Sequence, residues 1–594
     1  MVFVTNPADF AAIAFDYLVV GAGTAGLTLA ARLAEDDSVV VGVVEAGLSV
    51  ADSPEVNTPG LYSANIGNPK VDWCFKSTPQ VHANNRILGQ SSGKAVGGTS
   101  APLFLQLSPT REAAIEALGN PGWNWTEFLK YMKKSETFAS PSPEVTEHHH
   151  AGTSPEFHGT SGPIQKSYPR WYNALHTPFL EALVNLGALP RSDTRAGRNT
   201  GASTGIFTIN PRNVTRSYAG TAHYETSIHK KNLVILTGAQ VTRVLLEPGT
   251  DELVTATGIE FVKDGFEHIG RASREVILSA GSFQTPQLLE LSGIGRRDVL
   301  HRHGVKQFIH LPGVGENLRT SSQKKRHYSK YHTLRILVFS RSQMSYSQKE
   351  GRGMLSFGMF TAFALLSLKD TCGTEEAERI EVLLVEDKSL LARPTNRRQY
   401  PLLRKCLSDP DQAQTELVQV PGLYDWGTVK PELGVHYHTL LAISLHPLSR
   451  GTVHIASPDP FAYPAIDSDC FKNPIDLEIM MNAVKFAVKV ASTAPYYSQG
   501  QRVHDPPAEV LNDDDALREW CRNSVQTAFH PLGTAAMLPR ADGGVVDPSL
   551  KVYGTRNLRV VDASVIPIQL SCHPQGTIYA IAEKAADIIK ENRA

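Results

Sequence analysis

A short glycine-rich turn near the N-terminus is the feature that most constrains the fold of this chain. The apolar run Phe15–Val20 leads directly into Gly21-Ala-Gly23-Thr-Ala-Gly26, and a helix-like stretch follows at 27–36. This order predicts a strand, a tight turn and a helix. The first glycine permits the turn, the second lets the backbone approach a pyrophosphate, and the third allows close packing of the helix on the strand. Because the helix N-terminus then faces the phosphates, the segment predicts a dinucleotide-binding site.

An acidic residue completes this pattern. A second apolar run, at 39–44, ends in Glu45, which lies 19 residues after Gly26. A carboxylate at this distance can accept hydrogen bonds from both hydroxyl groups of the cofactor ribose. The motif predicts a nucleotide cofactor, but by itself it does not distinguish FAD from NAD.

Charge and hydropathy exclude several classes of partner. The 594 residues include 58 Lys and Arg against 59 Asp and Glu, a formal net charge of -1, so the overall charge favours neither nucleic acid nor an anionic membrane as a partner. No stretch approaches the roughly 18 consecutive apolar residues of a membrane span. The first 15 residues do not have the basic and apolar regions of a secretory signal, so we expect a protein of the cytoplasm or another intracellular compartment.

The cysteines are dispersed along the chain. None of them has the C-x-x-C spacing of a zinc site or belongs to a dense disulfide framework, so we expect reduced thiols and no metal centre. The tract His148-His-His150 lies in a stretch rich in Ser, Pro, Thr and Glu, and we interpret it as a solvated loop. The six cysteines are Cys74, Cys372, Cys406, Cys470, Cys521 and Cys572.

A second motif identifies the kind of nucleotide site. The sequence GSFQTPQLLELSGIG, from Gly281 to Gly295, directly follows the strand-like run 275–279, and it resembles a signature of the glucose-methanol-choline (GMC) family of flavin oxidoreductases. Five other segments are similar to the same family in the same order, and the closest resemblance is to the aryl-alcohol oxidase and dehydrogenase branch. These segments are 45–47, 93–100, 118–125, 446–457 and 557–567.

The resemblance implies an α/β fold with two domains. A Rossmann-like FAD-binding domain would be assembled from discontinuous segments, and an α+β substrate-binding domain would be inserted between them. Short β-rich runs at 233–236, 275–278 and 558–561 are compatible with buried strands of one sheet. The expected boundaries are 10–155, 226–320 and 526–594 for the FAD-binding domain, 156–225 and 350–525 for the substrate domain, and 321–349 for an atypical basic segment.

The resemblance also implies a set of residues that bind FAD. Glu45 and Ala46 would hold the adenosine ribose, Val241 would contact the adenine, and Thr99 would pass beside the isoalloxazine. Asp562 and Ala563 would close over the pyrophosphate and the ribityl chain. The full set is Gly21, Gly23, Thr24, Ala25, Gly26, Glu45, Ala46, Gly98, Thr99, Val241, Asp562, Ala563, Pro574 and Gln575.

Two histidines fall on the positions where the family has its catalytic pair. In the family, one group near the flavin takes the alcohol proton while hydride passes to flavin N5; His530 matches this position, and His573 matches its partner. Imidazole has an ordinary pKa of about 6.5, so it can accept a proton near neutral pH and release it later. A proline follows each histidine and favours an extended backbone there. Which of the two is the base stays open.

Two segments depart from the family pattern. After Gly97–Ser100 the family usually has a small residue, an aliphatic residue and an Asn close to the flavin, whereas this chain has Ala101-Pro102-Leu103. Family members with covalent flavin carry a histidine at the position of Pro102, so we expect FAD to be bound non-covalently.

The second departure is a basic stretch, 319–349. Its 31 residues carry eight Lys and Arg and no Asp or Glu. A basic arm for an acidic partner or nucleic acid is one reading. We interpret the stretch instead as a surface loop, or as sequence introduced by a mistaken exon boundary. The eight basic residues are Arg319, Lys324, Lys325, Arg326, Lys330, Arg335, Arg341 and Lys349.

Taken with the resemblance, these observations predict an FAD-dependent alcohol oxidoreductase. The expected reaction oxidises a small primary alcohol, such as an aromatic alcohol or a biosynthetic intermediate, to the aldehyde, with oxygen or a quinone-like compound as electron acceptor. Two alternatives stay open: a hydroxynitrile lyase in which FAD does no redox work, and a flavin-binding protein without turnover. The sequence does not decide between oxidase and dehydrogenase, nor does it give the oligomeric state.

Overall fold

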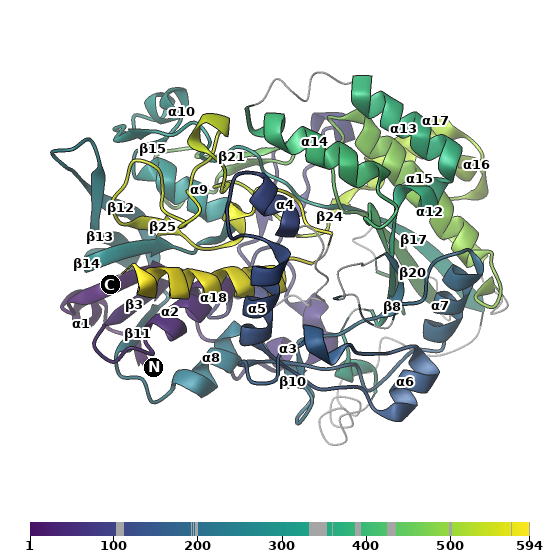
Figure 1. Ribbon diagram of the computed structural model, residues 1–594, viewed down its shortest axis with the longest axis horizontal. Helices are drawn as coiled ribbons and strands as arrows, with labels where there is room; N and C mark the ends of the chain where they lie inside the picture. Colours follow the sequence, from purple (N-terminus) through teal and green to yellow (C-terminus); the bar gives the residue numbers. More distant parts are fainter. Residues whose placement is uncertain are drawn as a thin grey trace.

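The protein is built around two large β-sheets. The computed structural model describes residues 1–101, 112–191, 193, 195, 200–331, 353–358, 360–386, 394–424, 435–497, 502–571 and 573–592. Within these ranges one sheet has eight strands and the other has seven. Figure 1 shows the two sheets in separate lobes, with both chain termini on the lobe of the first sheet.

The first sheet combines strands from distant parts of the sequence. Its parallel core has the order β1-β11-β3-β2-β14, and β25 also pairs with β14 in parallel. Strands β14, β13 and β12 form an antiparallel extension of this core. The short β-rich runs therefore lie in one sheet, and the expected Rossmann-like architecture is confirmed. The bounds are β1 Val2–Val4, β2 Phe15–Val20, β3 Val41–Glu45, β11 Leu233–Thr237, β12 Gln240–Pro248, β13 Val254–Lys263, β14 Phe266–Leu278 and β25 Leu558–Val560.

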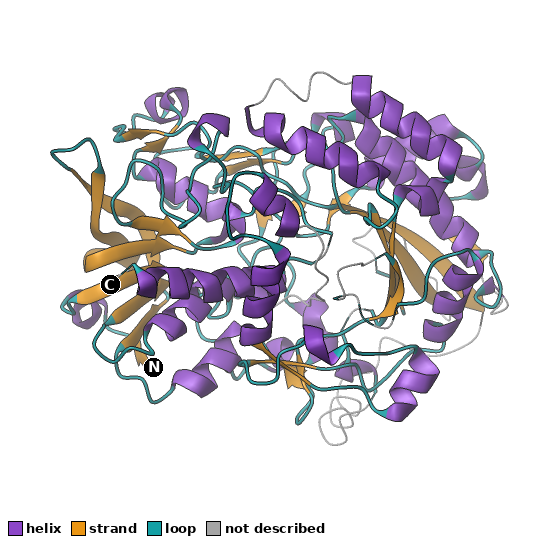
Figure 2. Ribbon diagram, viewed as in Figure 1, coloured by secondary structure: helices purple, strands orange, loops and turns teal. Residues whose placement is uncertain are grey.

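Two helices position the cofactor end of this sheet. Helix α2 (Thr24–Leu33) follows the glycine turn, and helix α18 (Gln575–Glu591) lies against it. The Arg32 guanidinium donates to both carboxylate oxygens of the fully buried Glu583, at 2.9 and 2.8 Å, and joins the two helices. Helix α5 (Trp125–Ser135) packs on α18, and Figure 2 shows the two helices next to each other. The helix predicted at 27–36 is confirmed in type, and the structure places it at Thr24–Leu33.

The second sheet is antiparallel and has the strand order β23-β17-β20-β19-β18-β8, with β24 paired to β17. Helices α7 (His176–Asn185) and α15 (Pro474–Ala491) cover one face through an apolar cluster that includes Leu417, Leu440 and Phe486. The opposite face is turned to the functional site described below. The bounds are β8 Gly201–Thr204, β17 Ser322–Tyr331, β18 Ala362–Leu366, β19 Thr415–Val420, β20 Val435–Ser444, β23 Arg502–Asp505 and β24 Gln526–Thr527.

The structure corrects the interpretation of the basic stretch 319–349 as a surface loop. Residues 322–331 form β17, which pairs with β20 on one side and with β23 and β24 on the other, so the expectation of a surface loop is wrong for this part. Lys324 is 1% exposed, donates to the Trp520 carbonyl at 2.7 Å and lies 4.0 Å from the centroid of the Trp520 ring. The sequence pattern misled because charged side chains are rare in buried strands. Residues 332–349 lie outside the described residues.

The remaining elements connect and cover the two sheets. One of them, α6 (Pro143–His149), replaces the loop expected around His148, and the ring of His149 stacks on Tyr172 with a centroid distance of 3.8 Å. None of the helices in the described part of the chain has the length and apolarity needed to cross a bilayer. The other helices of at least five residues are α1 Pro7–Ala11, α4 Glu112–Ala117, α8 Ala219–Ser227, α9 Gly281–Leu291, α10 Arg297–Arg302, α12 Leu368–Cys372, α13 Thr374–Glu386, α14 Pro394–Ser408 and α17 Asp514–Ser524.

Candidate active site

A deep pocket opens where strands of the first sheet end. Strands β2, β3, β14 and β25 all run into it, as expected for ligand sites at the carboxyl edge of parallel sheets. The space inside it, open mouth included, is about 1700 Å³. The sequence-predicted residues that line it are Gly21, Gly23, Thr24, Ala25, Glu45, Ala46, Gly98, Thr99, Val241, His530, Asp562, Ala563, His573, Pro574 and Gln575.

The glycine turn is packed too tightly for side chains. Gly21 has φ +98°, and a Cβ there would lie 2.6 Å from the carbonyl oxygen of Ser279. A Cβ on Gly26 would lie 2.0 Å from the carbonyl oxygen of Gly21, which explains why Gly26 packs the helix on the turn and does not line the pocket. Helix α2 begins without a side-chain cap on its N-terminus, so its first amide groups are available to an anionic ligand.

Glu45 lies at the end of β3 and is 6% exposed. Its carboxylate accepts hydrogen bonds from the amides of Ala22, at 2.7 Å, and Gly47, at 2.8 Å. Burial raises the pKa of Glu45 to about 7, against the opposing effect of these two amide donors. A carboxylate held at the pocket wall in this way can also accept hydrogen bonds from ligand hydroxyl groups.

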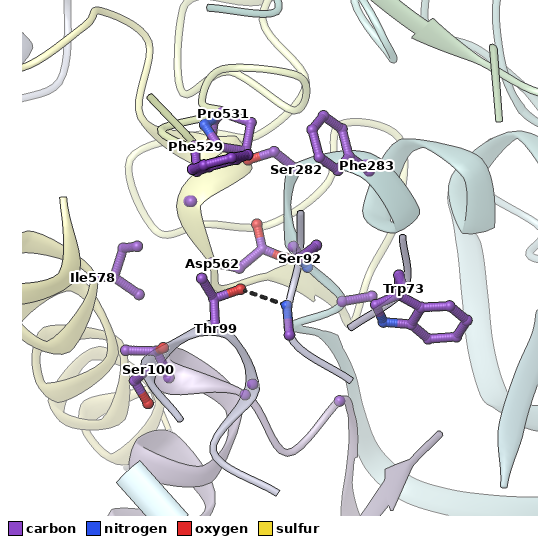
Figure 3. A pocket seen from close by; sticks show the side chains of 18 of the residues that line it. Trp73, Ser92, Thr99, Ser100, Ser282, Phe283, Phe529, Pro531, Asp562 and Ile578 are labelled. Carbon is purple, nitrogen blue, oxygen red and sulfur yellow. Dashed lines mark hydrogen bonds between the residues drawn. The ribbon is translucent and has the colours of Figure 1, made fainter. Parts of the chain in front are cut away.

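Asp562 organises the opposite wall. Its carboxylate accepts from the Gly281 amide at 2.9 Å and from the Thr285 hydroxyl at 2.6 Å, both at the start of helix α9. It also caps the short turn of residues 563–565 by accepting from the Ser564 amide at 2.8 Å. In the view of Figure 3, Phe529 and Pro531 lie on one side of the pocket and Ser100 on the other. Through these hydrogen bonds Asp562, which follows β25, connects the end of β25 to the start of α9.

His530 and His573 lie together at one end of the pocket. Their ring centroids are 4.7 Å apart and the rings are nearly perpendicular, with an interplanar angle of 74°. Both residues are buried, at 3% and 8% exposure. Neither Nδ1 atom has a hydrogen-bond partner among the described residues. Burial, reinforced by the neighbouring His573, holds the pKa of His530 well below its ordinary value, so the His530 imidazole is neutral at neutral pH.

Glu416, which the sequence reasoning missed, contacts this pair. It lies on β19 with its side chain 1% exposed, and its Oε1 is 3.0 Å from Nε2 of His573. An ionised carboxylate accepts the Nε2 hydrogen, which fixes the orientation of the ring and leaves Nδ1 to face other groups. The sequence did contain a signal, since an acid inside the otherwise apolar and β-forming run 415–420 requires a partner when buried.

The second sheet supplies an apolar and aromatic wall to the same end of the pocket. Ile443 on β20 lines the pocket there with Phe360, which precedes β18, and Tyr424, which follows β19, and the Phe360 ring centroid is 6.0 Å from that of His573. Tyr62, from the short helical turn Pro59–Ala64, joins this wall. These residues could not be predicted from the sequence, because they come from separate segments and carry no motif. The positions of Pro102 and Leu103 lie outside the described residues.

The residues of the pocket fit an elongated dinucleotide such as FAD. The glycine turn and the uncapped start of α2 form one anion-binding cradle, and the buried Glu45 lies beside it. Helix α18 also begins without a side-chain cap, next to His573, and Oε1 of Gln575 at its first turn is buried without a partner among the described residues. Polar backbone and amide groups at both ends of one long pocket are suited to a phosphate and a heterocyclic ring.

Comparisons with known proteins identify the family. Two sequence models described as GMC oxidoreductase match the chain, one over residues 15–322 and the other over residues 447–582. The chain is 33% identical over 613 residues to "Dehydrogenase citC" of Monascus ruber, covering 98% of this chain and 97% of that protein.

Solved structures agree with this assignment. An FAD-dependent oxidoreductase from Chaetomium thermophilum is 29% identical with a TM-score of 0.88, and the match covers 98% of this chain and 99% of that one. A fungal aryl-alcohol oxidase is 27% identical with a TM-score of 0.83, over 98% of this chain and 99% of that one. The chain therefore belongs to the GMC family of FAD-dependent oxidoreductases.

Proposed function

We propose that the protein oxidises a primary alcohol to the aldehyde and that His530 accepts the hydroxyl proton. The observation that carries this proposal is the buried His530–His573 pair at one end of the cofactor pocket, with Glu416 hydrogen-bonded to His573. The similarity to an aryl-alcohol oxidase supports an alcohol as the substrate.

The environment of His530 suits a base. Burial and the neighbouring His573 lower the pKa of His530, so its imidazole is neutral before the substrate binds and has a nitrogen lone pair for the hydroxyl proton. Protonated His530 would be disfavoured in the same surroundings, which promotes release of the proton later in the cycle. His573, oriented by Glu416, would position the substrate hydroxyl group between the two rings.

FAD, when bound, supplies the acceptor for the hydride that leaves the carbinol carbon. Phe360, Tyr424 and Ile443 line the pocket, and this apolar wall would limit the access of water to the reacting atoms. The residues proposed to hold FAD are Glu45 and the glycine turn at the ribose and pyrophosphate.

We propose non-covalent attachment of FAD, because Pro102 stands where family members with covalent flavin carry a histidine. Acid precipitation of the purified protein should release the flavin into the supernatant. Flavin that stays with the pellet would contradict non-covalent binding.

Anaerobic reduction of the purified flavoprotein by a panel of primary alcohols tests the proposed reaction. Bleaching of the flavin absorbance is expected, and later exposure to oxygen or to quinones identifies the electron acceptor. His530→Ala should keep its FAD and reduce it about 10²–10⁴-fold more slowly, the usual contribution of a general base. His301→Ala, at an exposed position on α10, is the matched control.

Three results would contradict the proposal. A spectrum that stays oxidised with every alcohol in the panel would indicate a lyase or a flavoprotein without turnover. Unchanged reduction in His530→Ala would remove His530 from the role of base. Equal losses in His530→Ala and His301→Ala would show that the effect is not specific to the pocket.

A further inference from the structure

The strand that begins the basic stretch contributes a polar side chain to the pocket. Gln323 lies on β17, is 3% exposed, and lines the pocket together with Ala528, Phe529 and His530. We propose that Gln323 recognises a second hydroxyl group on the substrate, so that the preferred substrates are aromatic primary alcohols with a further hydroxyl group on the ring. This inference rests on the proposed alcohol oxidation and names its substrate class.

The register of the second sheet places Gln323 in line with the histidine pair. Gln323 on β17 pairs with Ile443 on β20, and Ile443 pairs with Glu416 on β19. Directly paired residues of antiparallel strands project to the same face of a sheet. Gln323, Ile443 and Glu416 therefore form one row on the face that is turned to the pocket, and Glu416 at one end of this row contacts His573.

The length of this row fits a single aromatic ring. Adjacent strands lie about 4.8 Å apart, so Gln323 and Glu416 are separated at the backbone by roughly 10 Å. The apolar side chain of Ile443 occupies the middle of the row, and Phe360 and Tyr424 line the pocket near it. A substrate with its carbinol at the histidines would then place its ring over Ile443 and the opposite edge of the ring near Gln323.

The hydrogen bonds of Gln323 determine which chemical group it can recognise. Its Nε2 donates to the carbonyl oxygen of Thr527 at 2.9 Å. The reverse orientation of the amide would set two acceptor oxygens against each other, so the Thr527 carbonyl fixes the amide with Nε2 toward it. Oε1 of Gln323 receives no hydrogen bond from the described residues. An acceptor in the wall of the pocket that receives no hydrogen bond from these residues favours a ligand that brings a donor, and a hydroxyl group is the donor that an aromatic alcohol can carry.

The position of Thr527 couples this contact to the catalytic segment. Thr527 pairs with Ser322 of β17, and its hydroxyl accepts from the Phe529 amide at 3.0 Å, one residue before His530. Figure 3 shows Phe529 beside Pro531 on this side of the pocket. Gln323 is therefore held to the same backbone segment that carries His530, which fixes its distance from the reacting carbon.

A matched set of variants and ligands tests the inference. Wild-type protein, Gln323→Leu and Gln323→Met are compared with Gln526→Leu, which removes the cross-strand neighbour of Gln323 on β24 but does not line this pocket. The substrates are benzyl alcohol and the three isomers of hydroxybenzyl alcohol, and the readout is kcat/KM for flavin reduction. The wild type should prefer at least one hydroxylated isomer by about tenfold, the effect of one neutral hydrogen bond.

The variants should lose this preference selectively. In Gln323→Leu and Gln323→Met the ratio of kcat/KM for the hydroxylated alcohol to that for benzyl alcohol should fall to about one, whereas Gln526→Leu keeps the wild-type ratio. A ratio that is unchanged in both Gln323 variants would overturn the inference. So would a wild-type protein that shows no preference for any hydroxylated isomer.

A binding measurement separates this inference from the proposed function. The dissociation constants of benzaldehyde and the three hydroxybenzaldehydes are measured with the FAD-loaded protein from the perturbation of the flavin spectrum, which requires no turnover. If no alcohol reduces the flavin but a hydroxybenzaldehyde binds about tenfold tighter than benzaldehyde only while Gln323 is present, alcohol oxidation is refuted and the recognition by Gln323 stands. Equal binding of all four aldehydes refutes the recognition.

Discussion

Glu416→Gln tests the contact between the second sheet, which carries Glu416, and the histidine pair. The substitution keeps the size of the side chain and removes its negative charge, while the partner atom, Nε2 of His573, lies 3.0 Å away in a buried setting. Hydrogen bonds to charged groups contribute about 1.5–3 kcal/mol and neutral ones about 0.5–1.5 kcal/mol. Because the glutamine amide oxygen can still accept from Nε2, the loss is the difference of about 1–1.5 kcal/mol, and the rate of flavin reduction should fall about 5- to 13-fold. The FAD content should not change, because Glu416 is not among the residues that line the cofactor pocket.

Anaerobic stopped-flow reduction at saturating alcohol measures this effect directly. Flavin content, read from the ratio of flavin to protein absorbance, is compared between wild type and variant in the same preparation. Glu378→Gln, the same substitution at an exposed position on α13, is the matched control and should reduce its flavin at the wild-type rate.

The reasoning is refuted if Glu416→Gln reduces its flavin within twofold of the wild-type rate while it retains full FAD. That result would mean that the orientation of His573 does not depend on the Glu416 charge. A loss of FAD in this variant alone would also contradict the argument, because it would place Glu416 in cofactor binding instead of in the orientation of His573.

The remaining expectations concern cofactor binding and pH-dependent stability. Gly98→Ala should lower the FAD content at least tenfold, because a Cβ there would lie 2.6 Å from the backbone of the glycine turn; Gly67→Ala, also at positive φ but with nothing within 4 Å, should keep it. Burial alone would lower the pKa of His454, but hydrogen bonds and charges from Glu290 and Glu316 outweigh it and raise that pKa to about 9. Protonated His454 should therefore contribute up to about 3 kcal/mol below pH ~6.5, and this contribution is lost as the pH rises through 9. The difference in Tm between wild type and His454→Gln, followed from pH 6 to pH 9.5, should shrink; a constant difference would contradict it.

Local patterns were sufficient for the nucleotide half of the molecule. The strand Phe15–Val20, the glycine turn and the following helix appear as predicted, and the β-rich runs at 233–236, 275–278 and 558–561 lie in one sheet. These features are readable because each depends on neighbours in the sequence: an apolar run forms the strand, glycines permit the turn, and the helix follows at once.

The burial and the partners of polar residues in the second sheet could not be predicted from neighbouring residues in this way. Lys324 and Gln323 belong to a stretch whose composition indicated an exposed loop, yet β17 is paired on both sides in the second sheet. Glu416 is a single acid in an apolar run, and nothing near it in the sequence names its partner, which lies 157 residues away. Such residues are tolerated only because hydrogen bonds from distant segments compensate for their burial.

The sequence by itself determined the nucleotide motif, the order of the family segments and the two candidate histidines. Only the tertiary structure decided that His530 and His573 face each other, that Glu416 holds one of them, and that the basic stretch begins as a strand bearing Gln323 toward the same pocket. The physical reason is the range of the interactions: turns and strands follow from local backbone preferences, whereas a catalytic pocket is formed where segments hundreds of residues apart are brought together by the packing of two sheets.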